Sequence, residues 1–261
     1  RRGNVHLLRS RSTNAITDPR GSLRKANNML VMPANSTGWM FHSLARETSR
    51  IGHLFSPGAQ RGPWPWFPYA LDNGAFSCWD MRENKFDSEK WSTKVEEWKR
   101  LLVWAQSQEI KARWAIVPDV IGDSKATLEQ WPEYAPIVQS CDIPLAIAVQ
   151  DGMTRDDVRS LEIQPEVIAI GGTTEWKWKT VEMWARSFPR VHVLRCNSPQ
   201  KLYELEAMGI ESCDGTGWNR GDKTQTRGLE EWARQLAIPT THYLTDYTCK
   251  QPKDKKQIIF A

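Results

Sequence analysis

Polar residues that could do chemistry follow short apolar runs at several points along the chain. In the stretch YALDNGAFSCW, residues 69–79, an apolar run ends at Asp72 and Asn73, directly before a glycine. One aspartate in such a place is a common turn former. The pattern recurs, however, at six run ends: Asp72-Asn73, Asp119, Gln150-Asp151, Gly171-Gly172-Thr173, Asn197 and Asp214-Gly215. This repetition of carboxylates, carboxamides and bare backbone indicates one shared polar pocket.

These residue types suit glycosyl chemistry on a nucleobase. One ionised aspartate can attack a sugar carbon while another exchanges a proton with the leaving group. A carboxylate beside a glutamine and backbone amides can read a purine edge, because guanine offers N1–H and amino donors and an O6 acceptor. The sequence contains no motif typical of other reaction classes: it has no HExxH, no phosphate-binding Gly-rich loop, no Ser-His-Asp order and no cluster among its five histidines.

Alternating strand-like and helix-like segments would position these residues. Near-continuous apolar strands that alternate with helices predict a parallel sheet covered by helices. Strands are expected at 29–34, 68–72, 112–119, 145–151, 167–172, 192–197 and 210–216. Helices are expected at 39–50, 87–109, 123–140, 154–162, 176–187, 198–208 and 226–236.

Seven strand–helix units predict the α/β class and, within it, a (β/α)8 TIM-type barrel. The eighth strand would come from 5–9 or from 242–246. In such a barrel the carboxyl ends of the strands meet at one rim, where active sites form. A doubly wound open sheet is the alternative, but no GxGxxG motif follows any strand. No linker divides the chain, so we expect one catalytic domain, 29–261, after a basic extension, 1–28.

Positive charge is concentrated near the start of the chain. Residues 1–61 hold ten Arg or Lys against two acids, whereas the remainder holds 25 basic and 29 acidic residues. A second basic stretch, KQPKDKK, lies at 250–256. Such a distribution favours a polyanion such as DNA, although a solvated surface would have the same composition. The candidate nucleic-acid contacts are Arg9, Arg11, Arg20, Arg24 and Arg220.

Fourteen tryptophans are several times what a chain of 261 residues usually carries. Trp64 and Trp66 stand in a Pro-broken loop, RGPWPWFP, where exposed rings beside arginine could stack on the bases of a single strand. A loop packed on the body is an equal alternative. The five cysteines are scattered without a CxxC pair, which suits the reducing cytoplasm, and no apolar stretch approaches the roughly 18 residues of a membrane span.

Five segments, in order, resemble the tRNA-guanine transglycosylase superfamily and, within it, the DNA-modifying branch. That branch is the 7-deazaguanine DNA transglycosylases of phages and bacterial DNA-modification islands, and the resemblance covers roughly residues 29–220. The matching segments are YALDNGAF (69–76), WAIVPD (114–119), AIAVQDG (146–152), AIGGTTE (169–175) and GIESCDGTGWNRG (209–221).

The resemblance implies base exchange on guanine in DNA. Asp214 would be the nucleophile that forms a covalent glycosyl-enzyme, and Asp72 would be the general acid/base. A free 7-deazaguanine, such as preQ0, would replace the expelled guanine, with no cofactor. Partners would be DNA, the free base and proteins of a DNA-modification system, in the cytoplasm of the cell or of a phage host. The implied substrate-binding residues are Asp119, Gln150, Gly171, Gly172 and Asn73.

Two features depart from the tRNA-modifying members. Those carry CxCxxC and a later His that bind structural zinc, whereas only Cys249 follows Asp214 here, so no zinc subdomain and no metal are expected. The stretch after Asp214 reads GTGWNRGD where the family has Pro-Thr-Arg, which leaves Trp218, Asn219 and Arg220 without an implied role. The missing zinc ligands favour the DNA branch.

Three alternatives stay open at the level of sequence. A tRNA-guanine transglycosylase would use the same chemistry, and no residue reveals whether a 2′-OH is read. A retaining glycoside hydrolase on the same fold also needs two carboxylates, although its acids usually include Glu where this chain has Asp. A catalytically inactive DNA-binding module would be expected to lack Asp72 or Asp214, and both are present.

Overall fold

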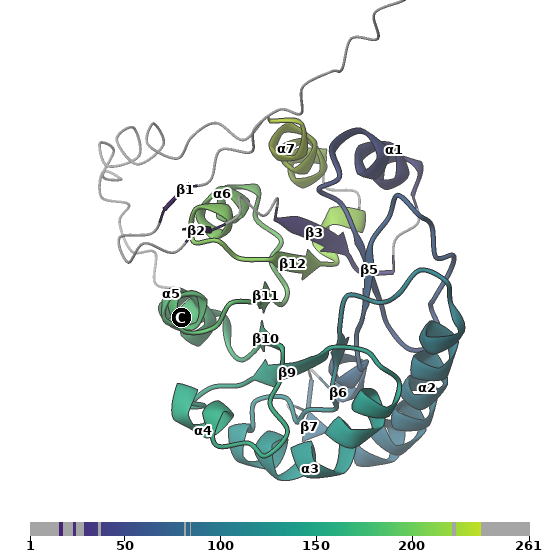
Figure 1. Ribbon diagram of the computed structural model, residues 1–261, viewed down its shortest axis with the longest axis vertical. Helices are drawn as coiled ribbons and strands as arrows, with labels where there is room; N and C mark the ends of the chain where they lie inside the picture. The colour runs from purple at the N-terminus through teal and green to yellow at the C-terminus, as the bar shows by residue number, and fades with distance from the viewer. Residues whose placement is uncertain are drawn as a thin grey trace, which may run out of the picture.

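Eight parallel strands form a nearly closed barrel with helices on its outside (Figure 1). The computed structural model describes residues 16–17, 23–24, 29–35, 38–80, 82–83, 85–220 and 223–235. The barrel strands are β3 (Leu30–Pro33), β4 (His53–Phe55), β5 (Tyr69–Leu71), β8 (Ala115–Ile116), β9 (Leu145–Val149), β10 (Val167–Ile170), β11 (Val191–Val193) and β12 (Ser212–Gly215). The helices are α1 (Trp39–Thr48), α2 (Ser88–Ser107), α3 (Ser124–Ser140), α4 (Arg155–Arg159), α5 (Thr174–Ser187), α6 (Pro199–Ala207) and α7 (Lys223–Arg234).

The strand order identifies the fold. Neighbours run β3-β12-β11-β10-β9-β8-β5-β4, and every neighbouring pair is parallel. Single parallel bridges, Val31 to Ile51 and Ala34 to Leu54, bring β3 beside β4 and so connect the two ends of the sheet. The protein is therefore a (β/α)8 TIM-type barrel, and the fold class expected from the sequence is confirmed. In this fold all strands point their carboxyl ends at the same rim.

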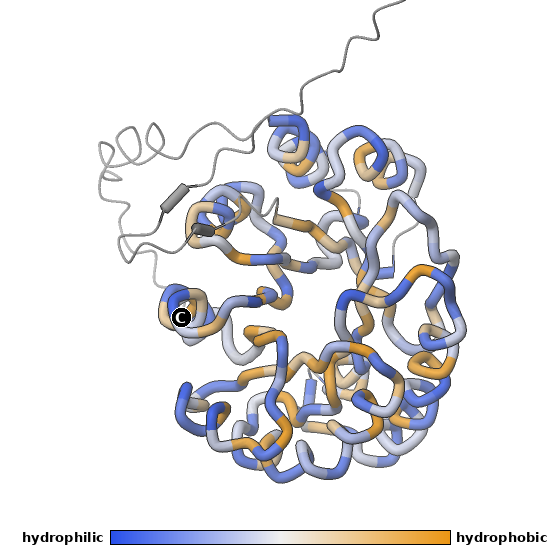
Figure 2. The backbone as a smooth tube through the Cα atoms, in the orientation of Figure 1, coloured by the Kyte–Doolittle hydropathy of each residue, from blue (hydrophilic) through white to orange (hydrophobic). Residues whose placement is uncertain are grey.

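Side chains alternate along each strand between two apolar cores. Figure 2 shows apolar positions gathered on the strands and on the helix sides that face them. The helices contribute stripes at a spacing of three or four residues, as in α2 with Trp91, Val95 and Trp98. The smaller core, which we assign to the barrel interior, is Leu30, Met32, Leu54, Ala70, Trp114, Ile116, Ala146, Ala148, Val167 and Ala169. The larger core lies between strands and helices, and a third, small cluster packs Ala75 and Cys78 against Trp91 and Val95 of α2.

The eighth strand corrects an expectation from the sequence. The candidate segments, 5–9 and 242–246, lie outside the described residues; β4 occupies the eighth place and pairs with β5. The pattern is weak there because only three residues pair and the first is a histidine, His53. Its ring is fully buried and stacks on Phe67 at a centroid distance of 3.9 Å.

Connections between the strands are regular with one exception. Residues 56–68, which join β4 to β5, contain no helix, so in the described part of the chain the outer ring has seven helices for eight strands. Of the expected extension 1–28, only β1 (Ile16–Thr17) and β2 (Leu23–Arg24) are described, so the domain boundary at residue 28 stays a prediction. No helix within the described ranges is long and apolar enough to span a bilayer.

Candidate functional site

A layer of polar residues lines the carboxyl rim of the barrel. Side chains of a strand that are two positions apart face the same side. Ala70 and Ala148 belong to the barrel core, so Asp72 and Gln150 face the barrel axis one layer above them. The same alternation brings five residues into this layer: Ser56, Asp72, Gln150, Gly171 and Asp214. We call this layer, together with Asp119, the mouth.

Asp72 holds its carboxyl group between two strands. Its backbone N–H donates to Phe55 O at 2.8 Å, and its Oδ2 accepts from the Ser56 hydroxyl at 3.0 Å. Burial raises the pKa of Asp72, and the negative charge of Asp214 raises it further. The two carboxylates that the sequence analysis paired are thus close enough to interact electrostatically.

Asp119 is nearly fully buried, and both of its carboxylate oxygens accept an amide N–H. Oδ1 accepts from Asn73 Nδ2 and Oδ2 from Gln150 Nε2, each at 2.7 Å. Burial raises the pKa of Asp119 to about 7, against the opposing effect of these hydrogen bonds. Near neutral pH this carboxyl group is therefore partly protonated.

Gln150 connects Asp119 to the backbone at the end of β10. Its Oε1 accepts from Gly172 N at 3.2 Å and from Gly122 N at 3.1 Å. Gly172 has φ +68°, and a Cβ there would collide with the carboxylate of Asp151, so the position requires glycine. Gly171 leaves bare backbone facing the mouth. Asp119, Asn73, Gln150, Gly171 and Gly172, predicted separately, lie together.

Asp214 is buried at the end of β12, with a relative exposure of 6%. Its Oδ1 accepts from the backbone N–H of Arg195 at 2.9 Å and lies 3.3 Å from His192 Nε2. Within the described ranges no hydrogen bond reaches Oδ2. The next residue, Gly215, packs against Asn197 and Cys196 so tightly that a Cβ would collide with both. Its small size serves the contact between β12 and the segment that follows β11.

Arg195 crosses the mouth and was missed by sequence reasoning. Its guanidinium donates to Gly172 O and lies 5.1 Å from the ring centroid of Phe76. Its backbone is left-handed, with φ +57°, and the buried Lys177 of α5 donates to Leu194 O at 2.6 Å and Arg195 O at 3.3 Å. Lys177 therefore holds the backbone bend that directs the Arg195 N–H toward Asp214.

Two further residues of the site also escaped the sequence analysis. Ser56 was missed because β4 was not recognised. His192 begins the segment HVLRCN, in which only Asn197 was taken as a site residue. Because His192 lies two residues before Leu194, strand alternation could have indicated that both side chains face the barrel interior. Asn197 itself turns to the backbone, where its Oδ1 accepts from Gly217 N at 2.8 Å.

Trp64 and Trp66 do not join the carboxylates. Trp64 packs edge-on against His42 of α1, at a centroid distance of 4.6 Å, and lies 5.8 Å from the ring of His53, on the outer side of β4. Trp66 stacks under the guanidinium of Arg46 at 4.7 Å. Together with α1 they line an external cavity of about 520 Å³. Both rings therefore pack against α1, and their role in holding a nucleic-acid strand stays a prediction.

The arginines divide into two groups. Arg220 is exposed after the short 3-10 helix η2 (Gly217–Asn219), which Asn219 ties to β3 by donating to Ala34 O at 2.7 Å. Arg220 therefore lies on the mouth side of β12. Arg9, Arg11 and Arg20 lie outside the described residues, and the side chain of Arg24 in β2 is not described either.

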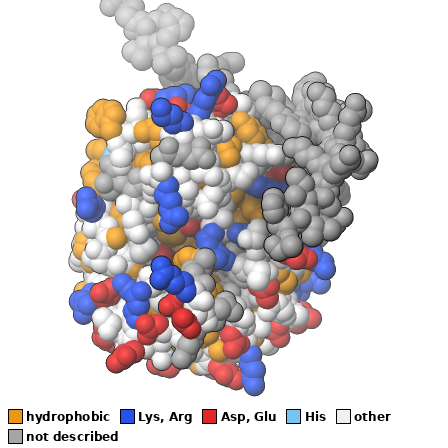
Figure 3. All heavy atoms as spheres, turned by 180° about the vertical axis from the view of Figure 1, so that it is seen from behind, with side chains coloured by type: hydrophobic (Ala, Val, Ile, Leu, Met, Phe, Trp, Pro, Cys, Tyr) orange, Lys and Arg blue, Asp and Glu red, His pale blue; other side chains and the backbone are white. Residues whose placement is uncertain are grey.

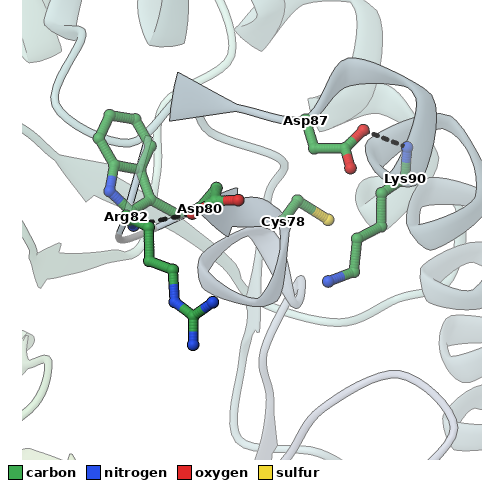
Figure 4. A pocket seen from close by; sticks show the side chains of 6 residues that line it. Cys78, Asp80, Arg82, Asp87 and Lys90 are labelled. Atoms are coloured by element: carbon green, nitrogen blue, oxygen red, sulfur yellow. Dashed lines mark hydrogen bonds between the residues drawn. The ribbon is translucent and has the colours of Figure 1, made fainter. Parts of the chain in front are cut away.

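A smaller hollow lies beside the hairpin of β6 (Trp79–Asp80) and β7 (Lys85–Phe86), with a volume of about 380 Å³ (Figure 4). In this hollow the carboxylate of Asp87 caps α2 by accepting from Lys90 N at 2.9 Å, so we assign Asp87 to local structure. In the part of the chain that is described, no three His, Cys, Asp or Glu side chains gather as metal ligands would.

The fold and the site define the class of protein: a (β/α)8 barrel whose mouth carries three interacting aspartates. Comparison of the sequence with models of protein families and with curated proteins gives no match.

Proposed function

We propose that this protein is a DNA-guanine transglycosylase, which exchanges guanine in DNA for a free 7-deazaguanine such as preQ0. One observation carries the proposal: Asp72 and Asp214 both lie in the rim layer, close enough to interact electrostatically, together with the hydrogen-bonded network of Asp119, Asn73 and Gln150. On this proposal, the nucleophile Asp214, the proton carrier Asp72 and the purine-reading residues Asp119 and Gln150 all belong to the mouth.

In the first half-reaction Asp214 Oδ2 attacks C1′ of the target nucleotide. The C1′–N9 bond breaks, and guanine leaves with the bonding pair on N9, which takes a proton from Asp72. The raised pKa of Asp72, caused by burial and by the charge of Asp214, suits a group that must hold that proton. A covalent glycosyl ester on Asp214 results.

In the second half-reaction the incoming 7-deazaguanine occupies the emptied pocket. Asp72, now ionised, takes the proton from N9 of the new base, and N9 attacks C1′. The C1′–O bond to Asp214 breaks, and its electron pair returns to the carboxylate. The ester conserves the reactivity of the glycosidic bond, so the exchange needs no nucleoside triphosphate and no redox cofactor.

The purine edge would meet Asp119 and the end of β10. A carboxylate oxygen can accept two hydrogen bonds, so each oxygen of Asp119 retains a position for the N1–H or the amino group of guanine. Gly171 presents no side chain to the base, so the base can approach the backbone closely, whereas the N–H groups of Gly171 and Gly172 already donate to Val149 O and to Gln150 Oε1. Asn73 has no free donor: its Nδ2 bonds to Val117 O and to Asp119, and we assign it to positioning Asp119.

A paired base is not reachable inside a duplex, so the target nucleotide must be flipped out or single-stranded. Arg220 and Arg195, both exposed on the mouth side, are the described cations best placed for the flanking phosphates. No described contact discriminates deoxyribose from ribose, and the substrate assay must therefore include both.

The test is incubation of the protein with guanine-containing oligodeoxynucleotide and preQ0, followed by nucleoside mass spectrometry. We expect the modified deoxynucleoside to accumulate as guanine is released. Matched oligoribonucleotides are tested in parallel. Modification of RNA alone would show that the substrate is RNA and not DNA. Absence of the modified nucleoside from both, with a folded protein, would overturn the assignment to base exchange.

A further inference from the structure

His192 and Ser212 form a buried polar pair directly below Asp214. They are register partners on the adjacent strands β11 and β12, and both have a relative exposure of 0%. His192 Nδ1 lies 2.8 Å from Ser212 Oγ, and the other ring nitrogen, Nε2, lies 3.3 Å from Asp214 Oδ1. The indole of Trp114 packs against the imidazole at a centroid distance of 4.6 Å.

The arrangement selects one tautomer of the histidine. A carboxylate oxygen only accepts, so Nε2 must carry the hydrogen. Nδ1 then accepts from the Ser212 hydroxyl, which has no other hydrogen-bond partner among the described residues. Every polar atom of the pair is used, as burial at this depth demands.

The bonds converge on one oxygen of Asp214. Both the Arg195 N–H and the His192 Nε2–H are directed at Oδ1. A carboxylate held at one oxygen has a fixed plane, and the second oxygen is left for attack. Ser212 cannot be a nucleophile toward substrate itself, since it is fully enclosed in the barrel.

We propose that His192, oriented by Ser212, is a positioning residue for the nucleophile Asp214. This inference rests on the proposed base exchange, in which the His192–Ser212 pair has two roles. The Nε2–H fixes the carboxylate so that Oδ2 meets C1′. It also stabilises the negative charge that returns to Asp214 when the C1′–O ester bond breaks in the second half-reaction.

Three variants separate this role from simple packing. His192→Phe keeps the ring volume but removes both hydrogen bonds, whereas His192→Gln retains an N–H donor for Asp214. His53→Phe is the matched control, because His53 is also fully buried but forms no hydrogen bond with any described residue and lies on the outer side of β4, against His42 of α1. Circular dichroism and thermal unfolding establish that each variant folds.

The readouts are the rate of guanine exchange and the fraction of enzyme trapped as covalent complex with DNA. We expect His192→Phe to slow exchange by about 10- to 100-fold, in the range for partners that orient a reacting group. The covalent fraction should rise, because ester breakdown loses more than ester formation. His192→Gln should recover most of the rate, and His53→Phe should match the wild type.

Long-range ¹H–¹⁵N spectroscopy of the wild type provides a readout independent of activity. We expect His192 to carry its hydrogen on Nε2, and Ser212→Ala to shift the Nδ1 resonance. An Nδ1–H tautomer, or equal slowing of both half-reactions in His192→Phe, would overturn the positioning role while base exchange stands. A wild-type protein that exchanges no guanine would overturn the proposed function, and the tautomer would still decide whether His192 donates to Asp214.

Discussion

Three aspartates share the mouth but differ in what surrounds their carboxylates. Asp214 receives two N–H donors at one oxygen, Asp119 receives an amide donor at each oxygen, and Asp72 receives the hydroxyl of Ser56. Burial raises the pKa of both Asp72 and Asp119. Such separation of environments allows one carboxylate to attack while another carries a proton.

The raised pKa of Asp119 predicts how stability depends on pH. The folded state binds this proton more tightly than the unfolded chain, whose aspartates titrate near 3.8, so the stabilisation is full below pH 4 and is lost as pH rises through about 7. The loss is at most about 4 kcal/mol for a shift of roughly three pKa units. Asp72 acts in the same direction.

Urea unfolding at pH 5 and pH 8 measures this effect. We expect the free energy of unfolding of the wild type to fall over that interval. The free energy of unfolding of Asp119→Asn should fall less, because its side chain cannot ionise. An identical decrease for both proteins would show that Asp119 does not titrate in this range.

At the scale of elements, the mouth depends on how β9 and β10 end. Gln150 is fixed by Gly172 N and Gly122 N, and Asp151 accepts from both the backbone N–H and the hydroxyl of Thr173 at 2.6 Å. The end of one strand therefore anchors the turn after the next, and the purine-reading side chain is held by backbone.

Gly172→Ala tests this anchoring. The left-handed backbone alone costs about 1 kcal/mol for alanine, and the collision of the new Cβ with Asp151 adds to it. Gly58→Ala is the matched control, since Gly58 has φ +79° and its nearest neighbour would lie 3.9 Å from a Cβ. We expect Gly172→Ala to lose more stability in chemical denaturation and to lose base exchange. Equal losses would mean that Asp151 moves away freely.

Most of the strands and helices were predictable from the sequence. Seven of the eight barrel strands and all seven helices overlap the segments that the alternation of apolar runs predicts, although β11 ends at Val193, four residues before the expected end at 197. Strand β4 was not predicted, because its three residues begin with a buried histidine and show too little apolar pattern. The same short strand hid Ser56. Arg195 could not be found either, since its contribution to Asp214 is a backbone N–H directed by a left-handed turn.

Over the whole molecule, charge is distributed unevenly along the chain. Figure 3 shows acidic and basic side chains interspersed over the face it presents. Residues 62–261 hold more acids than bases, whereas residues 1–61 are strongly basic. The proposed affinity for DNA is therefore expected to depend on the N-terminal arginines.

Replacing Arg9, Arg11, Arg20 and Arg24 with Gln should weaken DNA binding and flatten its dependence on salt. For every phosphate that the variant no longer neutralises, the slope of log K against log salt becomes shallower by about 0.7 to 0.9. The control replaces Arg186 and Arg227, which form surface ion pairs within helices, and should leave the slope unchanged. If affinity and slope persist in the fourfold variant, these arginines are a solvated surface only.

The central claim is that Asp214 forms a covalent bond to the sugar while Asp72 moves the proton. Denaturing gel electrophoresis of the enzyme with a guanine-containing oligodeoxynucleotide, alongside exchange of labelled guanine, tests it most directly. Asp214→Asn should abolish the covalent complex and slow exchange by about 10⁴-fold or more, whereas Asp72→Asn should retain some covalent complex but block its resolution by the incoming base. An Asp214→Asn protein that exchanges guanine at a near wild-type rate would contradict both the mechanism and the assignment of the site.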